Sequence, residues 1–96
     1  MNITTSAVGF VFSEDQQTLI DKKFERIKYA DDLIVDLKLK VKEDKQFIFE
    51  TTVNFKWGTN AHVSAEDYDF AACLNKMMDI LDQKIKKEKD KIQQKG

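Results

Sequence analysis

Side chains capable of catalysis or metal binding are scarce in this chain of 96 residues. His62 is the only histidine and Cys73 is the only cysteine, so a catalytic triad or a metal site lacks the partners that it requires. We expect His62 to be solvated on a strand and Cys73 to be buried as a small hydrophobic residue. The sequence therefore predicts neither a catalytic centre nor a metal site.

Carboxylates and glycines give no enzyme signature either. Asp31 and Asp32, like Asp67 and Asp69, fall at predicted turns and helix starts, where carboxylates act as caps and as partners of the helix dipole. The three glycines are scattered along the chain, so none forms a glycine-rich phosphate loop. We expect a protein that is not an enzyme and that uses no cofactor.

The lysines near the C-terminus give the clearest indication of a binding function. Residues 84–96 carry six lysines against two acidic residues, a net charge of +4, whereas the other 83 residues carry 10 basic and 15 acidic groups, a net charge of −5. Such an asymmetry indicates an anionic partner at the basic end. A solvated helix end is the alternative, because lysines also suit the negative end of a helix dipole.

On a helical wheel these lysines fall on two flanks of an apolar stripe. With 3.6 residues per turn, one flank is about 22 Å long and the other is shorter. The long flank holds Lys76, Lys84, Lys87 and Lys91, and the short flank holds Lys86 and Lys89. A straight basic ridge matches a phosphate backbone better than scattered solubilising charge does. The candidate RNA-binding residues are these six and the basic residues of the first predicted helix: Lys22, Lys23, Arg26 and Lys28.

The overall composition places these residues in one globular domain, residues 1–96. The chain has no proline, no apolar run of membrane-spanning length and no secretory signal at its start. A single cysteine suits a reduced, cytoplasmic compartment. The net charge of −1 is unusual for a nucleic-acid-binding domain, so the RNA hypothesis depends on the local ridge. No aromatic stacking platform is evident, which favours recognition of the backbone and shape of structured RNA.

The first half of the chain predicts a strand, a helix and a second strand. Residues 2–12 are rich in β-branched and aromatic types, with a possible kink at Gly9. Ser13 and Gln16 fit a capping box, and a helix follows to about Tyr29. From Val35 onward, apolar and polar residues alternate through position 42, so one strand face is buried and the other solvated. The apolar positions of that strand are Val35, Leu37, Leu39 and Val41.

The second half predicts two more strands and one long helix. Residues 47–55 alternate with a period of two, a turn follows around Gly58, and residues 61–65 form a short strand. A helix from about residue 68 to 93 is ~39 Å long, so its last turns extend beyond the sheet. Its apolar stripe consists of Phe70, Leu74, Met77, Met78, Leu81, Ile85 and Ile92.

The order β-α-β-β-β-α predicts an α+β two-layer sandwich. Both amphipathic helices pack on one face of a four-stranded sheet, because each strand has a single apolar face. The first two strands are joined by a helix and are expected to be parallel neighbours, whereas the two hairpins are antiparallel.

Two blocks of the sequence resemble the ribosome hibernation promoting factor family, also known as ribosome-associated inhibitors or protein Y. Residues 62–66 (HVSAE) and 69–72 (DFAA) are similar to the family signature HASAEG-x-DMYAAID. Residues 79–91 (DILDQKIKKEKDK) align without gaps to the family pattern DKLxRQLxKxKDK. Asn2-Ile3-Thr4 and residues 23–27 are similar as well, so the likeness covers essentially the whole chain.

The resemblance implies a fold like that of a double-stranded-RNA-binding domain and a ribosome-binding function. It implies binding in the mRNA and tRNA channel of the small ribosomal subunit, over the A and P sites, where the protein blocks translation and preserves idle ribosomes. The implied partner is ribosomal RNA, and neither a membrane nor DNA is expected as a partner. The protein is expected to be a monomer when it is not bound to the ribosome. The family positions that face RNA correspond here to Lys23, Arg26, Lys84, Lys87, Lys89 and Lys91.

Four positions depart from the family pattern. Ile80 stands where the family has lysine and Gln83 where it has arginine, so weaker or more salt-sensitive binding is expected. Ala71 and Asn75 replace a tyrosine and an aspartate. The chain ends at Gly96, whereas long family members continue into a domain that pairs ribosomes. This implies a short form that depends on a separate dimerising factor.

Two other binding functions fit the residues as well. A general structured-RNA binder is one alternative, although acidic residues 66–69 stand where the double-stranded-RNA-binding module has a lysine cluster. A protein-interaction adaptor that uses the outer sheet face and Ile80 is the other.

Overall fold

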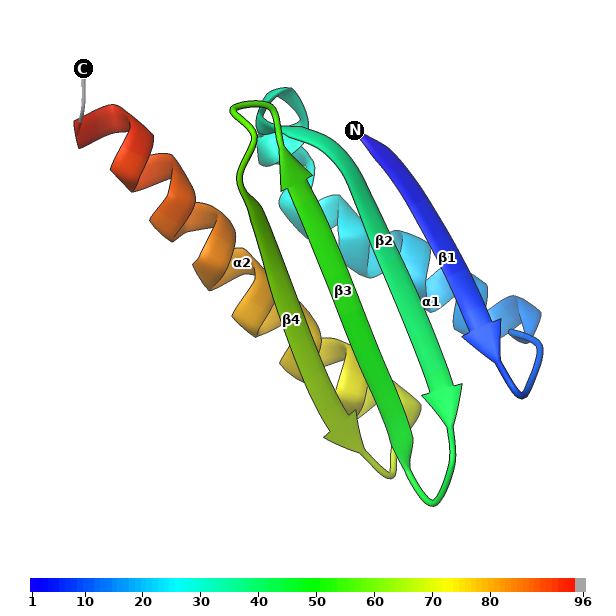
Figure 1. The fold of residues 1–96 in the computed structure, drawn as a ribbon. Helices are drawn as coiled ribbons and strands as arrows, with labels where there is room; N and C mark the ends of the chain where they lie inside the picture. The colour runs from blue at the N-terminus through cyan, green and yellow to red at the C-terminus, as the bar shows by residue number, and fades with distance from the viewer. Residues whose placement is uncertain (95–96) are drawn as a thin grey trace.

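The structure is a computed structural model that describes the backbone of residues 1–94 and the side chains of residues 1–91. Figure 1 shows one four-stranded sheet with both helices on the same side of it. In chain order the elements are β1 (Asn2–Val8), α1 (Glu14–Phe24), the 3₁₀ helix η1 (Glu25–Leu33), β2 (Ile34–Glu43), β3 (Phe47–Phe55), β4 (Asn60–Asp67) and α2 (Phe70–Gln94). The predicted order and the two-layer arrangement are confirmed.

The strands lie in the sheet in sequence order, β1-β2-β3-β4. β1 runs parallel to β2, and the β2–β3 and β3–β4 pairs are antiparallel, as predicted. β1 and β4 are therefore the two edges. Because paired residues point to the same face of a sheet, the register also defines which side chains lie under the helices and which lie on the uncovered face.

The core fills the space between the sheet and the helices. Phe49, Thr51, Val53 and Phe55 of β3 all point into it. The predicted stripe of α2 is confirmed up to Ile85, and Cys73 is fully buried beside that stripe. Ile92 lies outside the residues whose side chains are described. Burying these apolar side chains is the main force that holds the long helix on the sheet.

The start of the chain differs from the prediction, since β1 ends at Val8 and not at residue 12. Gly9 adopts a φ of +85°, a backbone conformation that suits glycine and turns the chain out of the sheet. Phe10 and Phe12 then fold under the sheet, and Phe10 packs edge-to-face on Phe47. Their aromatic character reflects burial in this cluster and not a continuing strand.

The prediction of one α-helix up to about Tyr29 is also wrong after Phe24. α1 ends at Phe24, and the chain tightens into the 3₁₀ helix η1, which continues to Leu33. Phe24, Ile27, Ala30 and Leu33 recur every three residues, and a 3₁₀ helix with three residues per turn aligns them on the core side. The capping box at the start of α1 is confirmed, because Ser13 and Gln16 each bond the other's backbone N–H.

Val35 was predicted to be buried, and it is 50% exposed. The register between β2 and β3 shifts between Ile34 and Asp36, so Val35 is the extra residue of a β-bulge. Ile34 takes the buried place, and the predicted alternation holds from Leu37 onward.

The ends of β4 and α2 are displaced from the prediction by a few residues. β4 continues from Asn60 to Asp67 and pairs with β3 up to Phe47, which delays the start of α2 to Phe70. The 25 residues of α2 make a helix about 37 Å long. In Figure 1 its last turns lie at the upper left, beyond the β4 edge of the sheet, so the predicted extension past the sheet is confirmed. Within the described residues, no helix has the length and apolar character needed to cross a membrane.

Candidate nucleic-acid interface

Three lysines of α2 lie along the edge strand β4. Lys84, Lys87 and Lys91 line a shallow hollow together with the β4 residues Ala61 and His62. The spacing of three and four residues places the lysines on one side of the helix, so the predicted long flank exists over its C-terminal half. We call these three lysines the α2 ridge.

The α2 ridge is the least neutralised part of the candidate surface. Lys84 and Lys87 form no ion pair with any carboxylate of the described residues, and Lys91 is 3.9 Å from Glu88. Glu88 itself is directed toward the β3–β4 turn, where it accepts long hydrogen bonds from Trp57 Nε1 (3.4 Å) and Thr59 Oγ1 (3.3 Å). The ridge therefore offers ammonium groups to an outside anion, and Glu88 ties it to the sheet.

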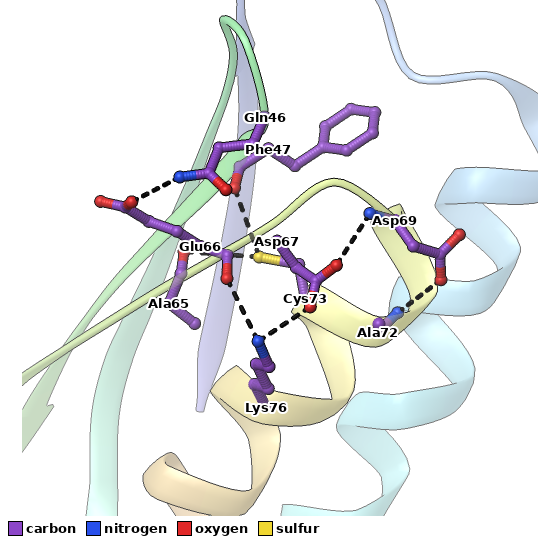
Figure 2. Close-up of polar contacts among 9 residues, drawn as sticks. All are labelled: Gln46, Phe47, Ala65, Glu66, Asp67, Asp69, Ala72, Cys73 and Lys76. Atoms are coloured by element: carbon purple, nitrogen blue, oxygen red, sulfur yellow. Dashed lines mark hydrogen bonds and ion pairs between the residues drawn. The ribbon is translucent and has the colours of Figure 1, made fainter.

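Lys76, at the other end of the predicted flank, is paired within the protein. Figure 2 shows its ammonium between the Asp67 carboxylate, 2.8 Å away, and the Glu66 carbonyl, 3.4 Å away. The carboxylate raises the pKa of Lys76. The pKa of Asp67 is lowered, first by the backbone N–H of Asp69 and then by Lys76. Lys76 thus stabilises the β4–α2 junction.

Lys86 and Lys89, on the short flank, face η1 and not β4. With Arg26 and Tyr29 they line a second hollow around Asp82. Lys86 Nζ lies 3.2 Å from Asp82, and Lys89 Nζ lies 5.9 Å from the centre of the Tyr29 ring, within cation–π range.

Asp82 is the acidic centre of this second hollow. It is buried and accepts a hydrogen bond from the Tyr29 hydroxyl. Arg26 lies 3.6 Å from Asp82 and 2.7 Å from Asp79. The hydrogen bond that Arg26 donates to Asp79 is the main cause that raises the pKa of Arg26. Burial, followed by the hydrogen bond to Asp82, raises the pKa of Tyr29.

The remaining candidates lie on the first helical segment. Lys22 is exposed and Lys23 half-buried on α1. Lys28 is 4.0 Å from Glu25 and lines a hollow with Met1 and Ile3 of the β1 edge, away from the α2 ridge. The two helices pack together, but Arg26 between them is engaged by Asp79 and Asp82. The ten candidates thus form separate groups and not one continuous basic face.

The expectations for His62, Asp69 and Cys73 are confirmed, whereas Asp31 and Asp32 lie within η1 and not in a turn. His62 is exposed and Asp69 caps α2 through the Ala72 N–H, 2.9 Å away. The buried thiol of Cys73 lies 3.4 Å from the Ala65 carbonyl, and burial raises its pKa (Figure 2). Asp31 pairs with the N-terminal ammonium of Met1 at 3.1 Å, a contact that sequence spacing does not reveal. Among the described residues, no group of His, Cys, Asp and Glu is arranged to hold a metal ion.

Sequence reasoning missed two features of the site. Asp82 and Tyr29 were not singled out, because Asp79 and Asp82 both lie between apolar residues of α2 and only the packing against η1 distinguishes the buried Asp82 from the exposed Asp79. The position of His62 beside Lys84 and Lys87 had no signal, because it depends on how α2 crosses β4.

Comparison with known proteins places this geometry in context. The model of the family described as sigma 54 modulation protein / S30EA ribosomal protein matches residues 3–93. No curated protein sequence gives a significant match.

Two solved structures have the same fold. A ribosomal subunit interface protein from Coxiella burnetii is 24% identical, with a TM-score of 0.85 over 94% of this chain and 99% of that chain. The N-terminal domain of Thermus thermophilus Protein Y is 22% identical, with a TM-score of 0.77 over 91% and 98% of the two chains.

Proposed function

This chain belongs to the sigma 54 modulation protein / S30EA ribosomal protein family, and from that membership we propose that it is a ribosome hibernation factor. It binds the small ribosomal subunit in the mRNA and tRNA channel, over the A and P sites. Occupation of the channel blocks translation sterically and preserves the idle ribosome. The function is non-enzymatic and cytoplasmic, and the partner is ribosomal RNA.

The observation that carries the proposal is the α2 ridge. Lys84 and Lys87 have no acidic partner among the described residues, so their charge is available to phosphate groups. Long helices present such charges at fixed intervals, and each phosphate that a lysine neutralises releases a counterion. Lys86, Lys89 and Arg26 provide a second, partly neutralised group on the opposite flank of the helix.

Lysines that pair with carboxylates inside the protein can also bind RNA if a phosphate replaces the carboxylate. Lys76 and Lys28 pair with carboxylates through exposed ammonium groups, and such pairs contribute little to stability because water competes for both charges. A ribosomal phosphate replaces the carboxylate at small cost. The first contacts are therefore made by the α2 ridge, and the paired lysines follow on closer approach.

The double variant Lys87→Glu/Lys91→Glu tests this function. We expect its affinity for vacant small subunits, measured by co-sedimentation, to fall roughly tenfold or more, because two phosphate contacts become repulsive. Wild-type binding is expected to weaken steeply with salt and to be displaced by tRNA. Thermal unfolding of the variant should stay close to that of the wild type, since both side chains are exposed.

Lys45→Glu is the matched control for the single variant Lys87→Glu. Lys45 is exposed in the β2–β3 turn, at the opposite end of the sheet, and the substitution changes the net charge by the same amount. Equal binding by Lys87→Glu and Lys45→Glu would remove the role given to the ridge. Equal competition by free duplex RNA would favour a general structured-RNA binder, and association that survives nuclease would favour a protein adaptor.

A further inference from the structure

The face of the sheet that the helices leave uncovered carries polar rows that cross all four strands. The register aligns Thr4 of β1, Lys38 of β2, Thr52 of β3 and His62 of β4 in one row. In that row Thr52 Oγ1 and His62 Nδ1 are 3.2 Å apart. This face points toward the viewer in Figure 1.

A second row runs beside the first and completes a shallow hollow on this face. It aligns Ser6, Lys40, Glu50 and Ser64, and most of the two rows lines the hollow. Lys38 and Lys40 form no ion pair with a carboxylate of the described residues, although Glu50 stands opposite Lys40 in the register. The two rows contain only hydroxyls, one imidazole, one carboxylate and two ammonium groups, with no apolar anchor of the kind that a protein partner uses.

His62 connects this face with the α2 ridge. His62 lines the hollow on the sheet face and also the hollow between β4 and α2 that Lys84, Lys87 and Lys91 line. The polar surface is therefore continuous from α2, around the β4 edge, onto the uncovered sheet face. The candidate residues chosen from the sequence include none from the sheet.

We infer that the ribose-phosphate backbone of one RNA strand follows this path from the α2 ridge, past His62, to Lys38 and Lys40. The inference rests on the proposed function and extends its RNA surface from the helices to the sheet. Charge complementarity supports RNA as the occupant, since unpaired lysines attract phosphates. Threonine and serine hydroxyls match the 2′-hydroxyls that distinguish RNA.

Lys38→Glu, with Lys45→Glu as the matched control, tests the path on vacant small subunits. We expect Lys38→Glu to weaken binding by roughly threefold or more and to reduce the slope of log affinity against log salt by about 1, because one phosphate contact is lost. Lys45→Glu is expected to leave both quantities near the wild-type values. Equal behaviour of these two variants, while Lys87→Glu still weakens binding, would overturn the inference and leave the proposed function intact.

An NMR titration with free RNA tests the proposed RNA path without the ribosome. Backbone amide signals of the labelled full chain are followed during titration with a single-stranded RNA of about 12 nucleotides. We expect shifts at residues 38–40 and 61–63 as well as at the α2 ridge. Shifts at the sheet without any binding to small subunits would support the RNA path and refute the hibernation function. Shifts confined to the α2 ridge would overturn the RNA path. If Lys38→Glu nevertheless weakened binding to small subunits, Lys38 would be assigned to a contact with a ribosomal protein.

Discussion

At the scale of single residues, Asp82 organises the contact between the two helical segments. It is 8% exposed, and its carboxylate contacts the Tyr29 hydroxyl, Lys86 and Arg26. Burial alone raises the pKa of a carboxyl group. Here the Tyr29 hydrogen bond and the two cations outweigh burial and lower the pKa of Asp82. Three partners therefore stabilise its ionised form.

We expect Asp82→Asn to lower the free energy of unfolding by about 1.5–3 kcal/mol, the range for a hydrogen bond to a charged group. Because the folded pKa lies below the unfolded value, the stabilisation by the carboxylate is present above about pH 4 and is lost as the pH falls through the folded pKa. Urea unfolding at several pH values measures the difference between variant and wild type. That difference should shrink only below about pH 4.

Asp79→Asn is the control for this prediction. Asp79 is exposed, and among the described residues its carboxylate pairs only with Arg26, so its removal should change stability by less than about 1 kcal/mol. A cost for Asp79→Asn as large as that for Asp82→Asn would assign the effect to Arg26 pairing and not to the buried carboxylate.

At the scale of elements, local signals decide where each helix begins, and the core decides how it continues. The Ser13–Gln16 capping box satisfies two backbone N–H groups at the start of α1. After Phe24 the apolar residues recur every three positions, and the chain follows them into η1. The transition from α to 3₁₀ geometry keeps Ile27 and Ala30 in the core.

Ser13→Ala is expected to lower the free energy of unfolding by about 1 kcal/mol, because it removes the hydroxyl that accepts from the Gln16 N–H. Thr18→Ala, at an exposed position of the same helix, is expected to be neutral or slightly stabilising because alanine has the higher helix propensity. Denaturant unfolding of both variants gives the comparison. Similar losses for the two would show that the cap does not stabilise α1.

At the scale of the whole molecule, α2 determines the long dimension. The extents are 45 × 20 × 19 Å, and the helix alone is about 37 Å long. The sheet covers one face of the helix from Phe70 to Ile85, and Ile85 is the last buried residue described. The basic turns after Ile85 therefore extend beyond the part of the helix that is packed on the sheet.

We expect amide hydrogen exchange to be slowest for residues 74–85 of α2 and much faster for residues 89–91, because none of these three side chains is buried. Exchange followed by NMR, residue by residue, measures this gradient. Vacant small subunits should slow exchange in the last turns if the helix is held along RNA. Uniform protection along the free helix would contradict the prediction.

The sequence by itself determined the elements and the faces that they bury. The alternation in β3 and the stripe from Phe70 to Ile85 depend only on the periods of strands and helices, and both are confirmed. The two flanks of lysines on α2 follow from the same helical period, and the capping box depends on residues three positions apart. These signals are local, so the chain carries them without reference to the fold.

Only the tertiary structure decided which charges are available. Arg26 is 53 positions from Asp79 in the sequence and 2.7 Å from it in space, and no local pattern predicts such a pair. The bulge at Val35 depends on the partner strand, and the position of His62 beside Lys84 depends on how α2 crosses β4. Periodicity assigns a side chain to a face of its own element. What that face meets is determined by the packing of elements that are distant in the chain.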